Sequence, residues 1–467
     1  MDEMGQKKRG RRVFVIGVGM TRFTKPAKEM DYPQLGLESG AKALLDAGIS
    51  YDQVEAGFAC YAYGDSTCGQ RVFYQFGMTG IPIVNVNNAC ATGSSGLYLA
   101  RESIRLGGSD VALVIGFEKM YSGSLKKFFL DRANPQQFFG EKLLQLRPES
   151  KPGAPCLFTN GAMEYIEKFD AQTDDLVEIA RLSHLHSSKN PYSQFRTVYS
   201  KDEIKNSARV YGPTTKLQCC PTSDGSGAAI LVSEDYLNKH PHLLPKAVEI
   251  AGQVLMTDQP TTFGNSSIDL VGFNMTQRAV HAALKQANAS IKDVKVCELH
   301  DCFAANVLIT IDALGLCEHG KAGKFIRDGN ITYGGRVVVN PSGGLISKGH
   351  PLGATGLAQC AELVWQLRGW ANNRLVTNAP IALQHNLGLG GAAVVSVYRR
   401  ADGGENQAVR SEVASAQSGL GYNPAVEWQP LTAQQLNRAS SRKNLQPFAR
   451  VGVQAKQNPA VQHGVNL

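Results

Sequence analysis

Cys90 is the residue of this 467-residue chain whose surroundings most suggest chemistry. It follows an apolar run at residues 83–86 and two asparagines, and the small residues 91–96 (Ala-Thr-Gly-Ser-Ser-Gly) come next, where a helix is expected to begin. A cysteine at a helix N-terminus lies near the positive end of the helix dipole, which lowers the pKa of the thiol and favours the nucleophilic thiolate. The alternative is a buried cysteine that packs as a small apolar side chain. This pattern alone does not separate the two roles.

Two histidines and a second cysteine are further candidates. Residues 298–303 (Glu-Leu-His-Asp-Cys-Phe) end a strand-like run, and side chains two apart in an extended segment point the same way, so His300 and Cys302 could line one pocket. His350 follows a glycine-rich stretch at residues 342–349 and precedes a proline at an expected helix start. This stretch lacks the spacing of a phosphate-binding P-loop. The alternatives are a buried histidine with satisfied hydrogen bonds and a histidine that caps a helix.

Residues 384–391 (Gln-His-Asn-Leu-Gly-Leu-Gly-Gly) are glycine-rich and lead into an expected strand, which disfavours a dinucleotide-binding fingerprint. We interpret them as a tight turn that exposes backbone N–H groups, with an ordinary glycine turn as the alternative. A cysteine nucleophile needs a proton acceptor, N–H donors for developing negative charge, and a second acid or base if a carbon–carbon bond is handled. The two histidines, the second cysteine and this turn together supply those parts.

The elements that must position these residues alternate between strands and helices, which predicts βαβ units with parallel strands. Strand-like runs occur at residues 13–17, 83–86, 111–116, 247–255 and 294–299, and helical patterns at residues 32–47, 92–106, 275–287 and 352–367. Similar sequences at residues 224–233 and 389–397 end two halves of the chain. Their positions favour an internal duplication.

Two segments differ from this pattern. Residues 121–216 are rich in Lys, Arg, Gln, Pro and Ser, and only residues 176–184 are strongly helical in pattern. Residues 401–467 are polar with weak periodicity, which predicts a partly extended or disordered tail. The predicted domains are an N-terminal half (1–120 and 217–245), an inserted loop domain (121–216), a C-terminal half (246–400) and a polar extension (401–467).

Composition narrows the class of protein. The ten cysteines include no Cys-x-x-Cys pair, which favours free thiols in a reducing compartment and predicts no metal site. No apolar run is long enough to span a membrane, and the first residues do not resemble a secretion signal. The net charge of +8 suits a mildly basic enzyme or one that attracts an anionic ligand. No nucleic-acid-binding motif is present, so nucleic acid is not an expected partner.

Four motifs, in this order, resemble those of the thiolase superfamily, and most closely the sterol carrier protein-type thiolases. They are Asn-Ala-Cys-Ala-Thr-Gly at 88–93, His-Asp-Cys-Phe at 300–303, Gly-His-Pro at 349–351 and His-Asn-Leu-Gly at 385–388. The resemblance extends from about residue 13 to residue 398. It implies an α/β fold of two similar βαβ-rich halves in a five-layer αβαβα arrangement with an inserted loop domain, and a homodimer or larger assembly.

The resemblance also implies an activity: cleavage of a 3-ketoacyl-CoA with CoA, or the reverse condensation, in fatty acid β-oxidation or related lipid metabolism. Cys90 would be acylated, and His350 would take its proton. His300 and His350 would hold the thioester oxygen of the second substrate, and Cys302 would be the acid/base at the α-carbon. The N–H groups of Cys90 and of the segment containing His385, Leu387 and Gly388, nearest Leu387, would form the other oxyanion site.

Other implications of the resemblance are less specific. Coenzyme A is substrate or product, with no permanently bound cofactor, and acyl-CoA molecules are the expected partners. The family is found in mitochondria or peroxisomes, so an intracellular organelle of one of these types is expected. Most thiolases have Asn-Glu-Ala-Phe in place of residues 300–303 and a second cysteine in a Cys-x-Gly motif, but the sterol carrier-type subfamily shares the exchange seen here. The fused lipid-carrier domain of some members is not expected, because residues 401–467 are too few and too polar.

Two alternatives stay open. A ketosynthase-like condensing enzyme would also use Cys90, His300 and His350, although Cys302 favours a thiolase. A weakly active acyl-CoA-binding scaffold is the other. Basic side chains of the insertion are candidates for CoA contacts, none of them distinguishable from ordinary surface charge: Lys126, Lys127, Lys189, Arg196, Lys201 and Lys205. His184 and His186 diverge on a helix and are not expected to share a metal.

Overall fold

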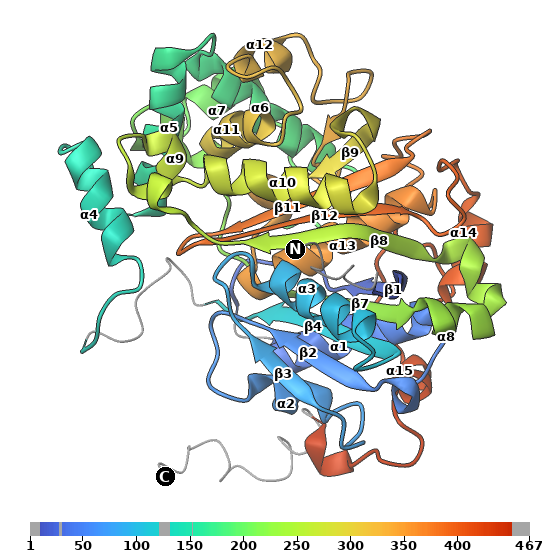
Figure 1. Ribbon diagram of the computed structural model, residues 1–467. Coiled ribbons are helices and arrows are strands. Elements are labelled where there is room, and N and C mark those ends of the chain that lie inside the picture. Colours follow the sequence, from blue (N-terminus) through green and yellow to red (C-terminus); the bar gives the residue numbers. More distant parts are fainter. Residues whose placement is uncertain (1–9, 28–29, 121–130, 152, 451–467) are drawn as a thin grey trace, which may run out of the picture.

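A mixed sheet of ten strands runs through the computed structural model, which describes residues 10–27, 30–120, 131–151 and 153–450 (Figure 1). The strand order is β10-β9-β11-β12-β8-β1-β7-β4-β2-β3. The first half of the chain contributes β1 (Val13–Met20), β2 (Ala56–Cys60), β3 (Ile83–Val86), β4 (Val111–Glu118) and β7 (Gly225–Ser233). The second half contributes β8 (Val248–Met256), β9 (Val294–Glu298), β10 (Val338–Val339), β11 (Ile381–Gly388) and β12 (Ala392–Arg400).

The two halves of this sheet repeat one topology. Counted outward from the centre, the order is β1-β7-β4-β2-β3 in the first half and β8-β12-β11-β9-β10 in the second. In each half the first two pairings are antiparallel and the next two are parallel. A short antiparallel pairing that includes Val15 and Val248 joins the halves. The two similar halves expected from the sequence are therefore confirmed.

Helices form the other three layers. α3 (Thr92–Arg105) and α13 (Leu352–Leu367) lie between the two half-sheets, and α1 (Tyr32–Ala47) and α10 (Phe273–Ala287) cover the outer faces (Figure 1). Every residue of α13 is buried, as a helix enclosed on all sides requires. α1 has the predicted bounds, with Gly48 in the left-handed conformation at its C-cap. The five-layer αβαβα arrangement is the predicted one.

Glycines let the two central helices meet at their N-termini. A Cβ on Gly356 of α13 would lie 2.3 Å from the backbone nitrogen of Ser94 in α3, and a Cβ on Gly93 would lie 2.6 Å from the carbonyl oxygen of Gly353. Side chains at these positions would force the helices apart. The first turns of α3 and α13 are therefore in direct backbone contact, and the residues that precede the two helices are brought together.

The segment after β4 is more helical than the sequence suggested. It contains α4 (Gln137–Leu146), α5 (Ala154–Lys168), α6 (Thr173–Ser187), α7 (Lys201–Lys205) and the short strands β5 (Arg209–Tyr211) and β6 (Thr214–Thr215). The prediction that only residues 176–184 are strongly helical was wrong. α5 and α6 bury their inner faces against α11 (Ala304–Ala313) in one large apolar cluster, so packing rather than strong periodicity stabilises them.

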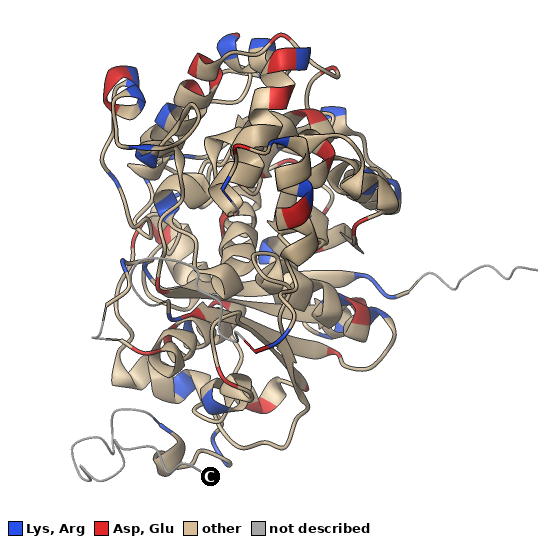
Figure 2. Cartoon of the chain, turned by 90° about the vertical axis from the view of Figure 1, so that its left-hand side faces the viewer, with Lys and Arg blue, Asp and Glu red and all other residues tan. Residues whose placement is uncertain are grey.

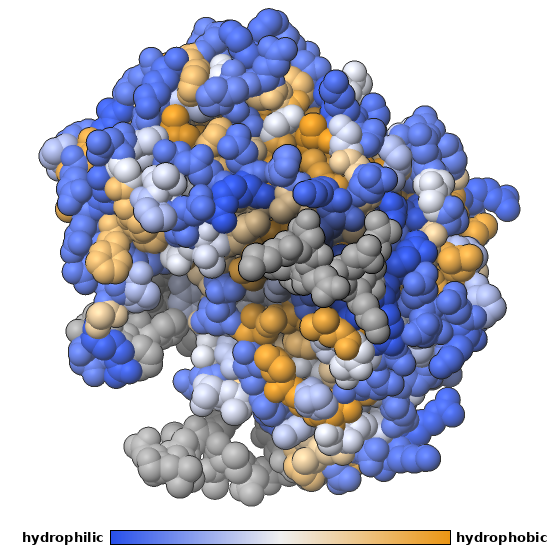
Figure 3. Space-filling model, viewed as in Figure 1, coloured by the Kyte–Doolittle hydropathy of each residue, from blue (hydrophilic) through white to orange (hydrophobic). Residues whose placement is uncertain are grey.

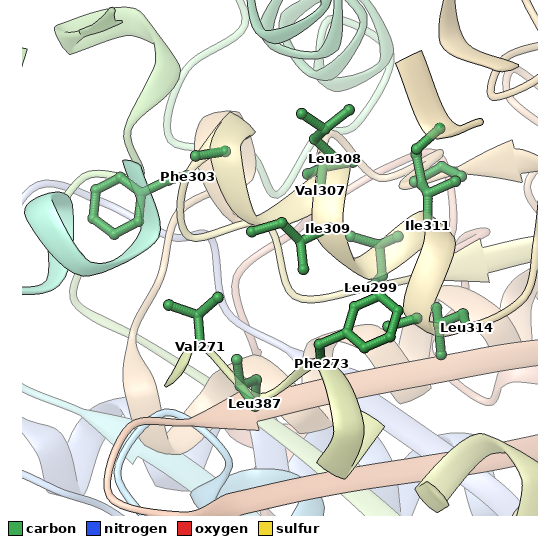
Figure 4. Packing of buried hydrophobic residues seen from close by; sticks show 14 of the residues in the cluster. Val271, Phe273, Leu299, Phe303, Val307, Leu308, Ile309, Ile311, Leu314 and Leu387 are labelled. Atoms are coloured by element: carbon green, nitrogen blue, oxygen red, sulfur yellow. The ribbon is translucent and has the colours of Figure 1, made fainter. Parts of the chain in front are cut away.

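The apolar cluster extends inward from these helices to the second half-sheet. Figure 4 shows Val307, Leu308 and Ile311 of α11 above Leu299, with Leu387 of β11 below. Shorter helices complete the fold: α2 (Cys68–Phe73), α8 (Glu234–Lys239), α9 (Ser267–Leu270), α12 (Ala322–Arg327), α14 (Ser411–Ser418) and α15 (Ala433–Ala439). Single 3-10 turns occupy Tyr51–Gln53, Lys216–Gln218, Pro241–Lys246, Pro260–Phe263, Ile291–Asp293 and Pro447–Ala449.

The described part of the tail, residues 401–450, packs on the body. Trp428 lies 5.0 Å from Nζ of Lys42 and donates from Nε1 to Glu38, both in α1. Arg374 of the second half donates to the carbonyl oxygen of Ala425 at 2.7 Å. This part of the tail is therefore packed rather than disordered, while most of it outside α14 (Ser411–Ser418) and α15 (Ala433–Ala439) is irregular, as a partly extended tail implies. Residues 451–467 lie outside the described residues.

The surface is of mixed charge. Lys and Arg residues are interspersed with Asp and Glu in Figure 2, and no broad face of one sign is visible in that view. Within the described ranges, no helix combines the length and the apolarity that crossing a membrane requires.

Candidate active site

Cys90 sits on a tight turn between β3 and α3. Ala89 before it has φ +49°, in the left-handed region that costs a non-glycine residue about 1 kcal/mol. The turn is closed by Thr92, whose hydroxyl donates to the carbonyl oxygen of Ala89 at 2.6 Å and accepts from the backbone N–H of Asn88 at 2.8 Å. Cys90 is partly exposed, whereas residues 91–97 after it are all buried. The strained turn therefore holds the Cys90 thiol where the chain passes from partly exposed residues to the buried start of α3.

Two imidazoles converge on this thiol. His300 follows the end of β9, and His350 follows a π-helical turn (Gly344–Lys348) and precedes α13. The ligand-type atoms of Cys90, His300 and His350 all lie within 4.8 Å of one another. The two imidazole rings are 5.2 Å apart at their centroids and meet edge to face. The three residues that the sequence singled out separately thus share one place, and the absence of a metal in it stays a prediction.

Cys302 lies beside this group. Burial is the main reason why the pKa of Cys302 lies well above its ordinary value, and the nearby Cys220 and Cys90 thiols raise this pKa further. The backbone oxygen of Cys302 accepts from the N–H of Cys220 at 2.9 Å. Asp301, between His300 and Cys302, points the other way and accepts from the N–H of Leu345 in the π-helical turn at 2.6 Å. The alternation expected for an extended segment thus places His300 and Cys302 on the side of Cys90.

The electrostatics of the site differ from the sequence-based expectation. Burial, together with the Glu118 carboxylate, raises the pKa of Cys90 to about 12. Burial lowers the pKa of His350 to about 3 and that of His300 well below its ordinary value. The direction of the Cys90 shift is opposite to the lowering of its pKa expected from the helix dipole, because burial disfavours the charged thiolate. The resting site is a neutral thiol beside two neutral imidazoles.

Residues 385–388 lie in β11, so the turn predicted within residues 384–391 is confined to the last three of them. The hairpin turn follows at residues 389–391, because Gly388 still pairs with Ala392 of β12. His385 is fully buried: its Nε2 lies 3.1 Å from Oγ1 of Thr276, and its Nδ1 accepts from the N–H of His300 at 3.5 Å. It supports the backbone of His300 and does not reach the thiol group. Gly388 does reach the turn that carries the thiol: a Cβ there would lie 2.3 Å from the carbonyl oxygen of Asn88.

Sequence reasoning missed Glu118, which ends β4. Its buried carboxylate accepts from the N–H groups of Ala62, Tyr63 and Gly353, and burial raises its pKa to about 7. It ties the start of α13 to the first half-sheet, close enough to Cys90 to affect its pKa. An acidic residue ending an otherwise apolar strand was the available signal.

A pocket lies next to Gly388. Its lining is mostly apolar and comes from α4, the α9–α10 connection and the β11–β12 hairpin, with one carboxylate: Phe139, Asp258, Leu270, Val271, Gly272, Met275, Leu387, Gly388, Leu389, Gly390 and Gly391. Its enclosed volume is about 10 Å³, room for about one water molecule, and the rest of the hollow is open to solvent. Figure 4 shows Val271 and Leu387 side by side at this place. Leu387, a predicted oxyanion residue, is buried here with its side chain in the pocket wall.

A duplicated five-layer fold with a cysteine before one central helix and a histidine before the other defines a thiolase-type acyltransferase. The chain matches the thiolase N-terminal domain over residues 13–235 and the thiolase C-terminal domain-like family over residues 262–400. It belongs to the thiolase family.

The similarity to curated proteins agrees with membership of the thiolase family. The chain is 53% identical to sterol carrier protein 2 of Gallus gallus over 392 residues, which are 83% of this chain and 72% of the relative. It is 45% identical to non-specific lipid-transfer protein-like 2 of Caenorhabditis elegans over 83% of this chain and 96% of the relative. It is also 30% identical to an acetyl-CoA acetyltransferase of Methanothermobacter thermautotrophicus over 84% of this chain and 100% of the relative.

Solved structures share the fold. The Ltp2-ChsH2(DUF35) aldolase superposes with a TM-score of 0.70 at 20% identity, over 84% of this chain and 98% of that chain. Human mitochondrial 3-ketoacyl-CoA thiolase in complex with CoA superposes with a TM-score of 0.62 at 19% identity, over 84% and 98%. At these identities the likeness concerns the fold alone.

Proposed function

We propose that this chain is a 3-ketoacyl-CoA thiolase that works through an acyl-enzyme on Cys90. The observation that carries the proposal is the grouping of the Cys90, His300 and His350 ligand atoms within 4.8 Å, with Cys302 beside them. Names among the relatives, such as acetyl-CoA acetyltransferase, support acyl-CoA substrates. Coenzyme A is then substrate and product, and no resident cofactor is needed.

In the proposed reaction, the side chains of the site and the two substrates account for every proton that moves and every bond that forms or breaks. Cys90 sulfur attacks the 3-keto carbon as its proton moves to His350, and the C2–C3 bond breaks. The electron pair of that bond becomes the enolate of acetyl-CoA, whose C2 takes the proton of Cys302. CoA then attacks the acyl thioester, its thiol proton restores Cys302, and His350 returns its proton to Cys90. The raised pKa of Cys302 keeps it protonated and ready to donate.

The acyl chain of the substrate would lie in the pocket beside Gly388. Gly388 touches the turn that carries Cys90, so an acyl group on the thiol is adjacent to this apolar lining. Basic residues are the proposed source of CoA contacts, but Lys201 and Lys205 already pair with Glu178 and Asp174. Lys126 and Lys127 lie outside the described residues.

We also propose a homodimer formed along β3. This strand is the last one of the sheet, so within the described chain one row of its backbone groups has no strand partner. Apolar side chains gather below the middle of Figure 3, where Figure 1 places β3 and α3. Val84 of β3 and Leu99 of α3 are 42% and 38% exposed. Val84→Lys is expected to shift the protein from dimer to monomer in sedimentation analysis, and an unchanged mass would argue against this interface.

The experiment that tests the function is thiolysis of a 3-ketoacyl-CoA by CoA, followed by loss of the enolate absorbance. Cys90→Ala is expected to abolish turnover and the acyl mass on the intact protein, while Cys317→Ala keeps both. Cys302→Ala is expected to accept an acyl group on Cys90 but to lose exchange of the α-protons of acetyl-CoA in heavy water. Turnover on a malonyl thioester with none on a 3-ketoacyl-CoA would instead indicate a ketosynthase.

A further inference from the structure

We propose that Ser94, Asn386 and Thr355 are positioning residues that hold the two site histidines in opposite tautomers, His300 protonated on Nε2 and His350 protonated on Nδ1. The catalytic consequence rests on the function proposed above. The tautomers themselves rest on hydrogen bonds that do not depend on which reaction is catalysed.

The tautomer of His350 follows from Thr355, one turn into α13. The Thr355 hydroxyl donates its single hydrogen to the carbonyl oxygen of Pro351 at 3.0 Å. Nδ1 of His350 lies 2.7 Å from the same hydroxyl oxygen, so Nδ1 carries a hydrogen and donates it. Nε2 of this neutral ring is then left with a lone pair. It is buried and has no hydrogen-bond partner among the described residues.

The tautomer of His300 follows from a relay that begins at a carbonyl group. The backbone oxygen of Gly356 only accepts, so the group 2.8 Å from it is the amide nitrogen of Gln384. This nitrogen also donates to Ser94 Oγ at 2.9 Å, and Ser94 passes its own hydrogen to Oδ1 of Asn386 at 2.9 Å. Nδ2 of Asn386 thereby faces Nδ1 of His300 at 3.0 Å and donates to it. Nδ1 is an acceptor, which leaves the ring hydrogen on Nε2.

Opposite tautomers give the His300 and His350 rings different chemical roles. The bare Nε2 of His350 takes the proton of Cys90 when the thiol attacks. The Nε2–H of His300 is a hydrogen-bond donor throughout the cycle and stabilises the enolate oxygen of acetyl-CoA. His350 becomes a second donor only while it holds the proton from Cys90. Because both rings are neutral at rest, their proton positions decide which ring is the base and which is the donor.

Substitutions at Thr355 and at Asn386 separate the role of His350 from that of His300. Thr355→Val keeps the shape but removes the acceptor for Nδ1–H of His350, and Thr355→Ser restores it. Asn386→Asp replaces the donor to His300 with an acceptor, which favours the Nδ1–H tautomer and removes the donor at Nε2. Ser94→Ala frees Asn386 to rotate without adding a buried charge, and serves if Asn386→Asp does not fold.

The readouts are acylation of Cys90, timed by mass spectrometry, and α-proton exchange of acetyl-CoA in heavy water. Thr355→Val is expected to slow acylation about 100-fold and to leave exchange within a few-fold, with Thr355→Ser near wild type. Asn386→Asp is expected to slow exchange and to leave the acylation rate within a few-fold of wild type. Ser94→Ala is expected to have the same effect more weakly. Equal losses of both steps in each variant would indicate a merely structural role and overturn the inference.

Neutron crystallography of the wild-type protein at neutral pD tests the tautomers directly. Deuterium on Nε2 of His300 and on Nδ1 of His350 is expected. Deuterium on the same ring nitrogen of both residues overturns the inference even if thiolysis is observed. An inactive wild-type protein that shows the expected deuterium positions overturns the proposed function and leaves the tautomer assignment intact.

Discussion

Asp301 and Gly344 are packed so closely that a Cβ on Gly344 would lie 2.0 Å from Oδ2 of Asp301. Gly344 has φ +58° and begins the π-helical turn whose Leu345 N–H binds the same carboxylate. Because Asp301 lies between His300 and Cys302 in the chain, this contact fixes both side chains relative to the turn that leads to His350.

Gly344→Ala is therefore expected to lower the free energy of unfolding by about 3 kcal/mol, through the clash and the left-handed conformation together. Urea denaturation measures the loss. Gly334→Ala is the matched control, because Gly334 has φ +87° and a Cβ added there would meet open space. It should lose only about 1 kcal/mol. Equal losses in the two variants would show that the contact with Asp301 is unimportant.

The reaction of Cys90 with iodoacetamide should keep accelerating with pH. Burial raises the pKa of this thiol to about 12, so the thiolate fraction grows about tenfold per pH unit up to that value. Peptide mapping after timed alkylation between about pH 6 and pH 10 measures the rate at Cys90 itself. A rate that levels off below about pH 8 would mean that the helix dipole dominates after all.

His186 should make stability depend on pH. Burial lowers its pKa from 6.5 to about 4, and the ring is held by Asn340 and Thr332. Below about pH 6.5 the unfolded chain binds a proton that the folded protein does not, so the contribution of the neutral ring is complete above that pH and is lost as pH falls toward about 4. Relative to His186→Asn, the wild type is expected to lose about 1.4 kcal/mol per pH unit over that range, or ~3 kcal/mol in all. Urea denaturation of both proteins from about pH 7 to pH 4.5 tests this, and a constant difference would contradict it.

Leu389 should control acyl-chain length. It lies at the β11–β12 hairpin in the wall of the apolar pocket, where a larger side chain would occupy part of the space. Leu389→Trp is expected to reduce kcat/KM for long 3-ketoacyl-CoA substrates about tenfold or more and to spare the shortest one, whereas Leu389→Ala should favour longer chains. A uniform change across chain lengths would place the acyl chain elsewhere.

Elements with strong local signals were predictable from the sequence. α1 has an N-terminal proline and a glycine C-cap, and the bounds of α1, β3 and α13 agree with the prediction. α5 was missed and α6 was predicted only over residues 176–184, because both helices depend on burial against α11, which is distant in the chain. The packed tail was missed for the same reason, since its partners lie in α1 and next to α13.

The sequence was enough to predict which residues form the site, but not the contacts that support them or the pKa of the thiol. Spacing and residue type pointed to Cys90, His300, Cys302 and His350, which the structure brings together. The supporting role of His385 could not be predicted, because it acts through contacts across the sheet, and the only sequence signal for Glu118 was its place at the end of an apolar strand. The pKa of Cys90 also follows from burial, which local sequence does not report.

Residues 401–450 touch both halves of the protein, through Trp428 on α1 and through Ala425 on Arg374. During synthesis this segment leaves the ribosome after both halves have been made. Its hydrogen bonds to Glu38 and Arg374 can therefore form only after both halves have been synthesised, and they then link the two halves through one continuous segment.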